Sequence, residues 1–487
     1  MTLNFSLALP EITLFSGALL VLMLDTFLGK KFKEFFYTSH LISLLVCAVT
    51  IFTIFLTFTP SALGFNSMFA SNSLTAFSKG VAVALLTLVI LLSLNFISKT
   101  PKISAEFLAL LMIATSGGMI LISANDFLVF YLGLELQALS LYLLAALNRD
   151  SAKSSEAGMK YFILGCLASG LLLFGITLIY GFSGTVNFTA LNNLYHTDDL
   201  EAFKNIPLAV MLGFILVITA MFFKISAAPF HMWTPDVYEG SAAISTTFFA
   251  TIAKFTTVIA LLRLFSSLII GWPGIEKIFL LVAMASLIIG SFGAIFQTNI
   301  KRLLAYSSIG HVGFILLGLA AFNKEAFAAC VFYIVIYAAI SIGSFGFLTL
   351  IKTKNSDKEN DELFSISSLA GLGKTNPTMA FSLAVLMFST AGIPPLAGFF
   401  SKLYILMAAV ERGLLFYAVA AIIFSVISAF YYLRIVKVMY FDEPKKPLEL
   451  EDCGNAKLIV FLAAIFNIIL IFFLNSIFTS ISNFVTF

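Results

Sequence analysis

Long apolar segments separated by short polar ones dominate this chain. A helix needs about 20 apolar residues to cross the hydrocarbon core of a membrane, and windows of that length recur along the sequence. They predict about fourteen membrane-spanning helices, at residues 8–28, 41–60, 74–97, 105–122, 126–147, 159–181, 206–227, 242–268, 276–298, 302–321, 326–350, 377–409, 414–440 and 457–484. The predicted fold class is therefore an all-α integral membrane protein.

Composition agrees with this pattern. The 487 residues are 60% hydrophobic and only 11% charged, whereas a soluble protein of that size needs a charged surface. Lipid is therefore the expected solvent for most of the outer surface. The first apolar segment is long enough to span and has no basic region before it, so we expect no cleavable signal peptide.

The same composition argues against several kinds of site. The net charge of +3 is spread over short loops, which does not fit nucleic-acid binding. The four cysteines lie far apart and form no C-x-x-C pair, and no G-x-G-x-x-G follows a strand-like segment. We expect no metal, iron–sulfur cluster or dinucleotide in this chain.

Basic residues predict the orientation, because cytoplasmic loops of membrane proteins carry an excess of Lys and Arg. Loops after odd-numbered spans hold most of them, whereas even-numbered loops hold little more than Lys204, Lys277, Lys324 and Arg412. Odd loops are therefore predicted to be cytoplasmic. Both termini then face the outside, which requires an even number of crossings.

Two stretches of the chain share a layout. A polar break at residues 123–126 and another at 297–299 each separate two spans, and a proline-broken span follows each of them further along. By the span count, the two units begin on opposite sides of the membrane. That arrangement is typical of the inverted repeats of transporters.

Four charged residues stand out among those within or beside the predicted spans. An ionised side chain at the centre of a bilayer costs about 2.5–3.5 kcal/mol on insertion scales, so such residues usually face a protein interior or a water-filled path. They are Glu135, Lys224, Lys254 and Lys402. Each also has a structural interpretation: Glu135 as the partner of a basic residue, and the lysines as groups that extend to the membrane surface or lie outside the hydrocarbon.

Other ionisable residues are more ambiguous. Nearer to the ends of spans lie Asp25, Lys79, Lys160, Arg263 and Arg434, for which we expect interfacial anchoring. Lys160 is kept as a candidate functional residue. His231 and His311 fit a structural role and a role in proton transfer equally well, since the reference pKa of histidine is already about 6.5.

Two of the candidate lysines lie close in sequence to a proline within a predicted span. Lys224 precedes Pro229, and Lys402 follows Pro394 and Pro395. Proline removes a backbone donor, and within a membrane the freed carbonyls must bond neighbours or water. A broken helix at membrane depth therefore implies a hydrated cavity, and a buried amine beside such a cavity can take up and release protons.

The motifs around these residues resemble a known family. Residues 223–240 (FKISAAPFHMWTPDVYEG), 299–311 (NIKRLLAYSSIGH) and 391–402 (AGIPPLAGFFSK) are similar to the seventh-, tenth- and twelfth-helix signatures of the antiporter-like subunits of bacterial NADH:quinone oxidoreductase, respiratory complex I. The similarity covers nearly the whole chain. Lys402, where a sister subunit typically has Glu, and the lack of a long extra helix after the last span favour the subunit N branch.

The resemblance implies an organisation in four parts. Residues 1–104 would hold helices 1–3, residues 105–268 and 269–440 two inverted five-helix repeats with broken helices 7 and 12, and residues 441–487 a loop and helix 14. It also implies a bacterial inner membrane, other membrane-arm subunits of complex I as partners, and quinone as the substrate of the complex. Flavin and iron–sulfur clusters would lie in partner subunits.

The resemblance also assigns roles. Glu135 would tune Lys224, and a proton would pass by Lys254 and His311 to Lys402, near the outer exit, with His231 and Lys160 as further polar members. Quinone reduction elsewhere would drive the transfer. Three alternatives remain: a subunit of a cation/proton antiporter, a structural scaffold, and a transporter for a specific solute.

Overall fold

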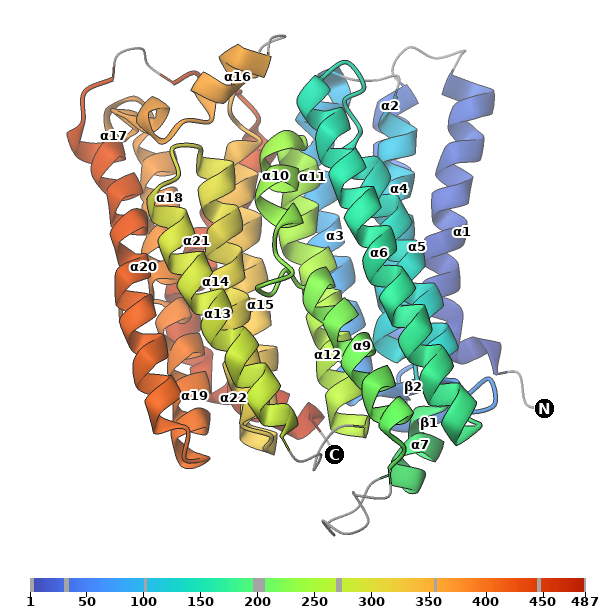
Figure 1. The fold of residues 1–487 in the computed structure, drawn as a ribbon. Helices are drawn as coiled ribbons and strands as arrows, with labels where there is room; N and C mark the ends of the chain where they lie inside the picture. Colours follow the sequence, from blue (N-terminus) through green and yellow to red (C-terminus); the bar gives the residue numbers. More distant parts are fainter. Residues whose placement is uncertain are drawn as a thin grey trace.

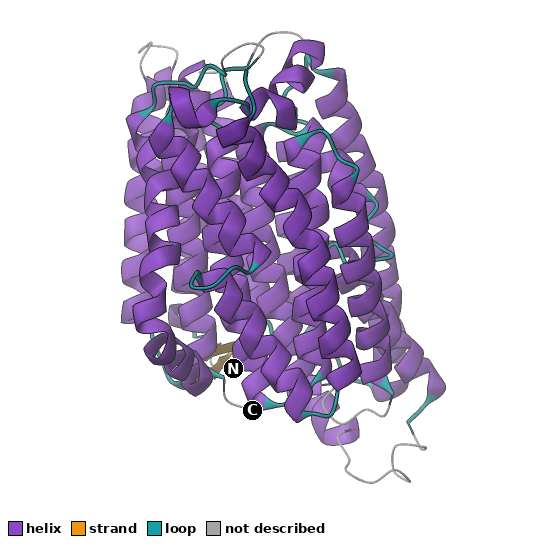
Figure 2. Ribbon diagram, turned by 90° about the vertical axis from the view of Figure 1, so that its left-hand side faces the viewer, coloured by secondary structure: helices purple, strands orange, loops and turns teal. Residues whose placement is uncertain are grey.

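The computed structural model describes residues 4–29, 35–99, 103–195, 206–268, 274–353, 357–444 and 448–485, and nearly all of them are helical (Figures 1 and 2). In chain order the elements are η1 (Phe5–Ala8), α1 (Leu9–Leu24), η2 (Asp25–Gly29), α2 (Phe35–Leu56), β1 (Ser61–Gly64), β2 (Phe69–Asn72), α3 (Ser73–Lys99), α4 (Ser104–Ser123), α5 (Phe127–Ala145), α6 (Ala152–Ser183), α7 (Phe188–Tyr195), α9 (Leu208–Lys224), α10 (Trp233–Gly240), α11 (Ala243–Phe248), η4 (Phe249–Ala253), α12 (Lys254–Leu268), α13 (Ile275–Ile295), α14 (Ile300–Ala320), α15 (Lys324–Leu348), α16 (Asp357–Leu363), η5 (Ile366–Leu369), α17 (Leu372–Thr375), α18 (Pro377–Ala391), α19 (Ala397–Glu411), α20 (Leu415–Phe441), α21 (Gly454–Ile469), η6 (Leu470–Phe473) and α22 (Leu474–Phe484).

The predicted membrane fold class is confirmed. Within the described ranges, 12 helical segments are long and apolar enough to span a membrane, and α9 and α18 are shorter apolar helices. These two are the predicted seventh span and the first half of the predicted twelfth, and each ends where the chain approaches its proline break. The total of fourteen crossings remains a prediction.

The ends of the described chain lie on one side of the bundle. The start of α1, the β1–β2 hairpin, α7 and α22 gather at the lower end in Figure 1, whereas α16 and α17 cover the upper end. This arrangement fits an even number of crossings. Which end faces the cytoplasm remains a prediction from the loop charges.

Polar caps explain why helices start at the two predicted breaks. The Asp126 side chain accepts a hydrogen bond from the backbone N–H of Leu128 at 2.7 Å, and Asn299 accepts one from Lys301 at 2.9 Å. Short carboxylate and amide side chains satisfy the free N–H groups of a first helical turn. The breaks therefore follow from local sequence.

Glycine sets how closely the helices at these breaks approach each other. A Cβ on Gly117 of α4 would lie 2.6 Å from the backbone nitrogen of Gln137 on α5. A Cβ on Gly290 of α13 would lie 2.5 Å from the backbone nitrogen of Gly310 on α14. Only glycine permits this contact between the two backbones.

Two arginines make matching contacts at the same breaks. Arg263 of α12 donates to the backbone carbonyls of Ile122 and Ala124, at the C-terminal end of α4. Arg434 of α20 donates to those of Ile295 and Gln297, at the C-terminal end of α13. These contacts go beyond the interfacial anchoring expected for the two arginines, because each guanidinium donates to carbonyls at a helix end.

The loop that follows each unit's third helix also pairs with the break. Asp126 forms an antiparallel bridge with Asn187, just before α7, and Asn299 forms one with Ser365, just before η5. The first bridge lies at the end of the bundle that carries α7 and the second at the end that carries α16 (Figure 1). Equivalent contacts thus recur at opposite ends of the molecule.

Candidate functional site

Lys402 is buried beside the proline break that precedes it. Its ammonium donates to the backbone carbonyls of Thr390 and Ala391, each at 2.9 Å. In an uninterrupted helix these carbonyls would accept from residues 394 and 395, which are prolines and carry no N–H. Lys402 therefore replaces the two missing backbone donors, and its third donor reaches the hydroxyl of Ser425 on α20 at 2.9 Å.

Lys224 is the last residue of α9, on the near side of the other break. The chain turns at Ser226, a buried residue with a φ of 67°, and the indole N–H of Trp233 donates to the carbonyl of Phe223 at 3.0 Å. The ammonium of Lys224 donates to the hydroxyl of Tyr142 on α5 at 3.2 Å. The break thus leaves the amine at the end of a helix, facing the interior of the bundle.

Glu135 lies near the middle of α5 and is half-buried. It accepts a short hydrogen bond from the hydroxyl of Ser169 on α6. Among the residues that the structure describes, Glu135 and Lys224 form no direct ion pair, so the expected contact is absent in this state. Tyr142, about two turns further along α5, is the group that Lys224 contacts instead.

Lys254 is buried at the middle of the span Ala243–Leu268. A π-helical turn, η4, comes directly before it, and such turns often occur at functional positions because they change the register of a helix. The ammonium donates to the hydroxyl of Ser308 on α14 at 2.9 Å. The prediction that this lysine faces the protein interior is confirmed.

A small cavity joins the two central lysines. It has about 20 Å³ of room for water centres, and its lining includes Gln137, Lys224, Ser226, Lys254 and Thr257. A cavity needs roughly 10–15 Å³ on this measure to hold one water with polar partners. Water in this cavity can therefore connect Lys224 with Lys254.

One face of α14 continues the polar line. Ser308, His311 and Phe314 follow one another at intervals of three residues, so they share a face. Ser308 contacts Lys254, and the ring of Phe314 lies 5.3 Å from the ammonium of Lys402. His311, between them, is buried and lies within electrostatic reach of both lysines.

Tyrosines hold His311 in place. The hydroxyl of Tyr333 lies 2.6 Å from Nδ1, and that of Tyr432 lies 3.4 Å from Nε2. Tyr432 also hydrogen-bonds Ser307. Both ring nitrogens therefore have hydroxyl partners, which can donate or accept and so suit either tautomer.

His231 and Lys160 lie outside this line. His231 is in the loop of the first break, and within the described chain no hydrogen bond joins it to the other predicted residues; its buried Nδ1 has no partner there. Lys160 is about two-fifths exposed and pairs with Glu156 at 2.7 Å and Asp236 at 2.8 Å. Lys160 therefore belongs to a different cluster.

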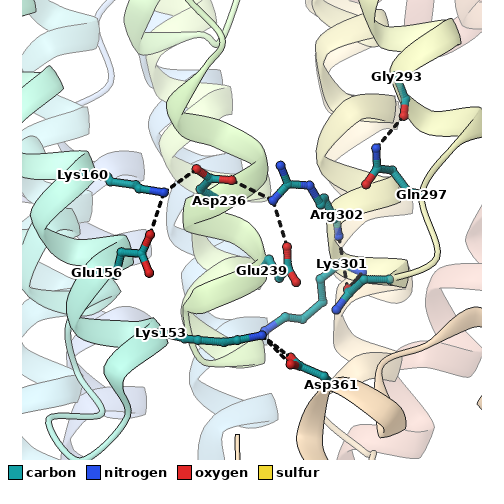
Figure 3. A network of polar contacts seen from close by, with 11 residues as sticks. Lys153, Glu156, Lys160, Asp236, Glu239, Gly293, Gln297, Lys301, Arg302 and Asp361 are labelled. Carbon is teal, nitrogen blue, oxygen red and sulfur yellow. Dashed lines mark hydrogen bonds and ion pairs between the residues drawn. The ribbon is translucent and has the colours of Figure 1, made fainter. Parts of the chain in front are cut away.

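That cluster is a network of ion pairs around α10 (Figure 3), and α10 lies in the upper half of the bundle in Figure 1. Asp236 of α10 also contacts Arg302 of α14 at 2.7 Å, and Arg302 contacts Glu239 at 2.9 Å. The network connects α6 with the segment after the first break and with the helix that carries His311. Lys160 thus helps to fix α10 between its neighbours.

Sequence reasoning missed the neutral members of the site. Tyr142, Ser308, Tyr333, Ser425 and Tyr432 carry the contacts described above, yet no charge distinguishes them from other hydroxyl residues in apolar segments. Helical spacing from His311 was the one available signal for Ser308.

Comparison with known proteins places the chain in a family. The model of the family described as NADH:quinone oxidoreductase/Mrp antiporter, TM, matches residues 124–428. NADH-quinone oxidoreductase subunit N of Paramagnetospirillum magneticum is 43% identical over 453 residues, which is 91% of this chain and 89% of that protein. The chain belongs to the NADH-quinone oxidoreductase subunit N family.

Solved structures agree with membership in the subunit N family. A chain of respiratory complex I from Thermus thermophilus is 26% identical, with a TM-score of 0.78 over 96% of this chain and 98% of that one. A chain of the Mrp complex from Dietzia is 19% identical with a TM-score of 0.81, over 99% of this chain and 97% of that one, which shows a common fold. Both neighbours are parts of multi-subunit membrane complexes.

Proposed function

We propose that this chain is the proton-translocating membrane subunit of a bacterial NADH:quinone oxidoreductase. The observation that carries the proposal is the buried line of protonatable groups, from Lys224 through Lys254 and His311 to Lys402. Membership in the subunit N family supports the assignment to this complex. Relatives with this name are subunits of an oxidoreductase, and the role proposed for the chain within it is proton transfer.

In this mechanism, quinone reduction in other subunits shifts charge along the membrane arm. The shift changes the distance between Glu135 and Lys224, and so changes how tightly Lys224 holds its proton. The proton passes through the water-sized cavity to Lys254, then along α14 by His311 to Lys402, and leaves on the outer side. Flavin, iron–sulfur clusters and quinone belong to partner subunits.

The two lysines at the breaks act in different ways. Within the described residues, Lys224 hydrogen-bonds one side chain, that of Tyr142, and it lines a cavity, so it can change partner at little cost. Lys402 donates hydrogen bonds to two backbone carbonyls that lack donors because of the neighbouring proline break. The neutral amine keeps two N–H donors, one fewer than the three acceptors that Lys402 contacts, so loss of its proton weakens one of these contacts and favours water at the exit.

The proposal includes two inverted five-helix units, residues 105–268 and 269–440. The matching contacts of Arg263 and Arg434, and the matching bridges at Asp126 and Asn299, support it. The chain would cross the bacterial inner membrane with both termini outside, next to lipid and to other membrane-arm subunits.

The test is Lys224→Ala in the assembled complex, with NADH-driven proton pumping as the measurement. We expect pumping to fall strongly while the complex still assembles. Lys277→Ala is the matched control, because Lys277 is exposed in the first turn of α13, at the edge of a span. Full pumping by Lys224→Ala with normal assembly would reject the assignment.

A stand-alone cation/proton antiporter subunit is the second candidate. The fold shared with the Mrp complex and the joint family description favour it. Purification of the native complex separates the two: NADH-oxidising subunits accompany the chain in one case and are absent in the other.

A further inference from the structure

A buried ion pair lies outside the line of lysines. The ammonium of Lys79 on α3 lies 2.6 Å from Oε1 of Glu11 on α1, and both side chains are only 4% exposed. The expectation that Lys79 is an interfacial anchor is wrong. The pair also lies outside residues 124–428, which the family model matches.

The pair lies within the membrane-spanning part of the bundle. Its helices begin their spans at Phe5 and Ser73, at the end that carries the termini. Each charged residue comes about six residues, or roughly 9 Å, after that start. Both charges are therefore at the same depth, inside the bundle and away from lipid.

Buried polar atoms of Glu11 and of the residue that precedes Lys79 form no hydrogen bond within the described residues. They are both carboxylate oxygens of Glu11 and the hydroxyl of Ser78. The contact between Oε1 and Lys79 is an ion pair whose angles fall outside hydrogen-bond geometry. Buried polar atoms without protein partners are usually satisfied by water.

A cavity for that water adjoins the pair. It has about 10 Å³ of room for water centres, about the size of one water, and its lining includes Thr57, Ser71 and Lys79. Phe58, also in the lining, is about half exposed, so the cavity lies next to the surface. A water there would lie against Thr57, Ser71 and Lys79 together.

We propose that Glu11 and Lys79 form a second protonatable site, hydrated from the end of the bundle that carries the termini, at which the chain exchanges protons with the outer aqueous phase. Helix α3 connects this site with the central one, because it packs against η4, α12 and α15, the elements that surround Lys254. The contribution of the pair to pumping rests on the proposed function.

A purely structural clamp between α1 and α3 is the competing interpretation, and paired substitutions separate the two. Replacing a buried ion pair by apolar or neutral groups of similar volume is often neutral or stabilising. A clamp therefore predicts that E11Q/K79M assembles and pumps normally. A protonatable site predicts normal assembly with pumping at least twofold lower, because no proton can bind there.

The experiment measures NADH-driven pumping and assembly for E11Q/K79M in the whole complex. Ser93→Ala is the control, since it removes a buried hydroxyl from α3 at its other end. Pumping equal to this control, with normal assembly, overturns the proposal. Lys254→Met is measured in the same assay. Full pumping by that variant rejects the proposed function, independently of the result for the Glu11–Lys79 pair.

Water access is tested independently of pumping and of whether E11Q/K79M assembles. Thr57→Cys lines the cavity, whereas Thr53→Cys lies one turn deeper on α2 and outside the lining. A membrane-impermeant thiol reagent added on the outer side should modify the first and not the second, as identified by peptide mass spectrometry. Failure to modify Thr57→Cys overturns hydration of the pair and the proposal with it.

Discussion

Replacing Lys254 by Met removes the central protonatable group and nearly preserves its volume. The structure indicates a small effect on stability. Ser308, the hydroxyl that Lys254 contacts, keeps its own hydrogen bond to the carbonyl of Ala305 at 2.7 Å. The substitution therefore removes one hydrogen bond, worth about 1 kcal/mol, and also removes a buried charge, which offsets that loss.

The expected effect on pumping is much larger. Lys254 lies between the cavity that it shares with Lys224 and the face of α14 that leads to His311. A positioned proton-transfer group typically contributes about 10²–10⁴-fold to a rate. We expect Lys254→Met to lower the rate of proton pumping at least about tenfold, which corresponds to about 1.4 kcal/mol in the barrier.

The assay is NADH-driven acidification of inside-out membrane vesicles, with assembly checked by native electrophoresis. Lys254→Arg tests the reasoning further, because arginine keeps the positive charge but does not release its proton at physiological pH. We expect Lys254→Arg to pump as poorly as Lys254→Met. Full pumping by either variant in a normally assembled complex would refute proton exchange at this residue.

Three further substitutions test other parts of the structure. Glu135→Gln removes the carboxylate that Ser169 contacts and should lower pumping severalfold without loss of assembly; unchanged pumping would separate Glu135 from the mechanism. Gly117→Ala places a methyl group 2.6 Å from a backbone nitrogen, so it should lower the stability of the assembled complex by about 1–3 kcal/mol, measured by thermal denaturation. Gly170→Ala is the control and should leave the stability unchanged, because nothing lies within 4 Å of the added methyl group. Arg263→Met removes the cap on the end of α4 and should cost about 1.5–3 kcal/mol, read as faster proteolysis of the complex; resistance equal to that of the unmodified protein would contradict the capping role.

Local sequence determined the membrane class, the positions of the spans and the two breaks. Hydropathy acts over about 20 residues, and proline removes its own N–H whatever surrounds it, so both can be read without knowing the fold. The same reasoning identified Lys254 as an interior group, because a side chain near the middle of a span cannot reach water past lipid, and the neighbouring proline break marked Lys402 as a candidate. The structure confirms both as buried.

Only the tertiary structure decided which groups these charges contact. The proline break by itself predicts that the carbonyls of Thr390 and Ala391 lack backbone donors. That the ammonium of Lys402 donates to both depends on how α19 packs against α18. Lys79 was misread because a lysine six residues into a span can reach the surface unless another helix places a carboxylate beside it, and Glu11 lies on a helix distant in sequence. Depth in the membrane is a property of the segment, whereas partners are a property of the packing between segments.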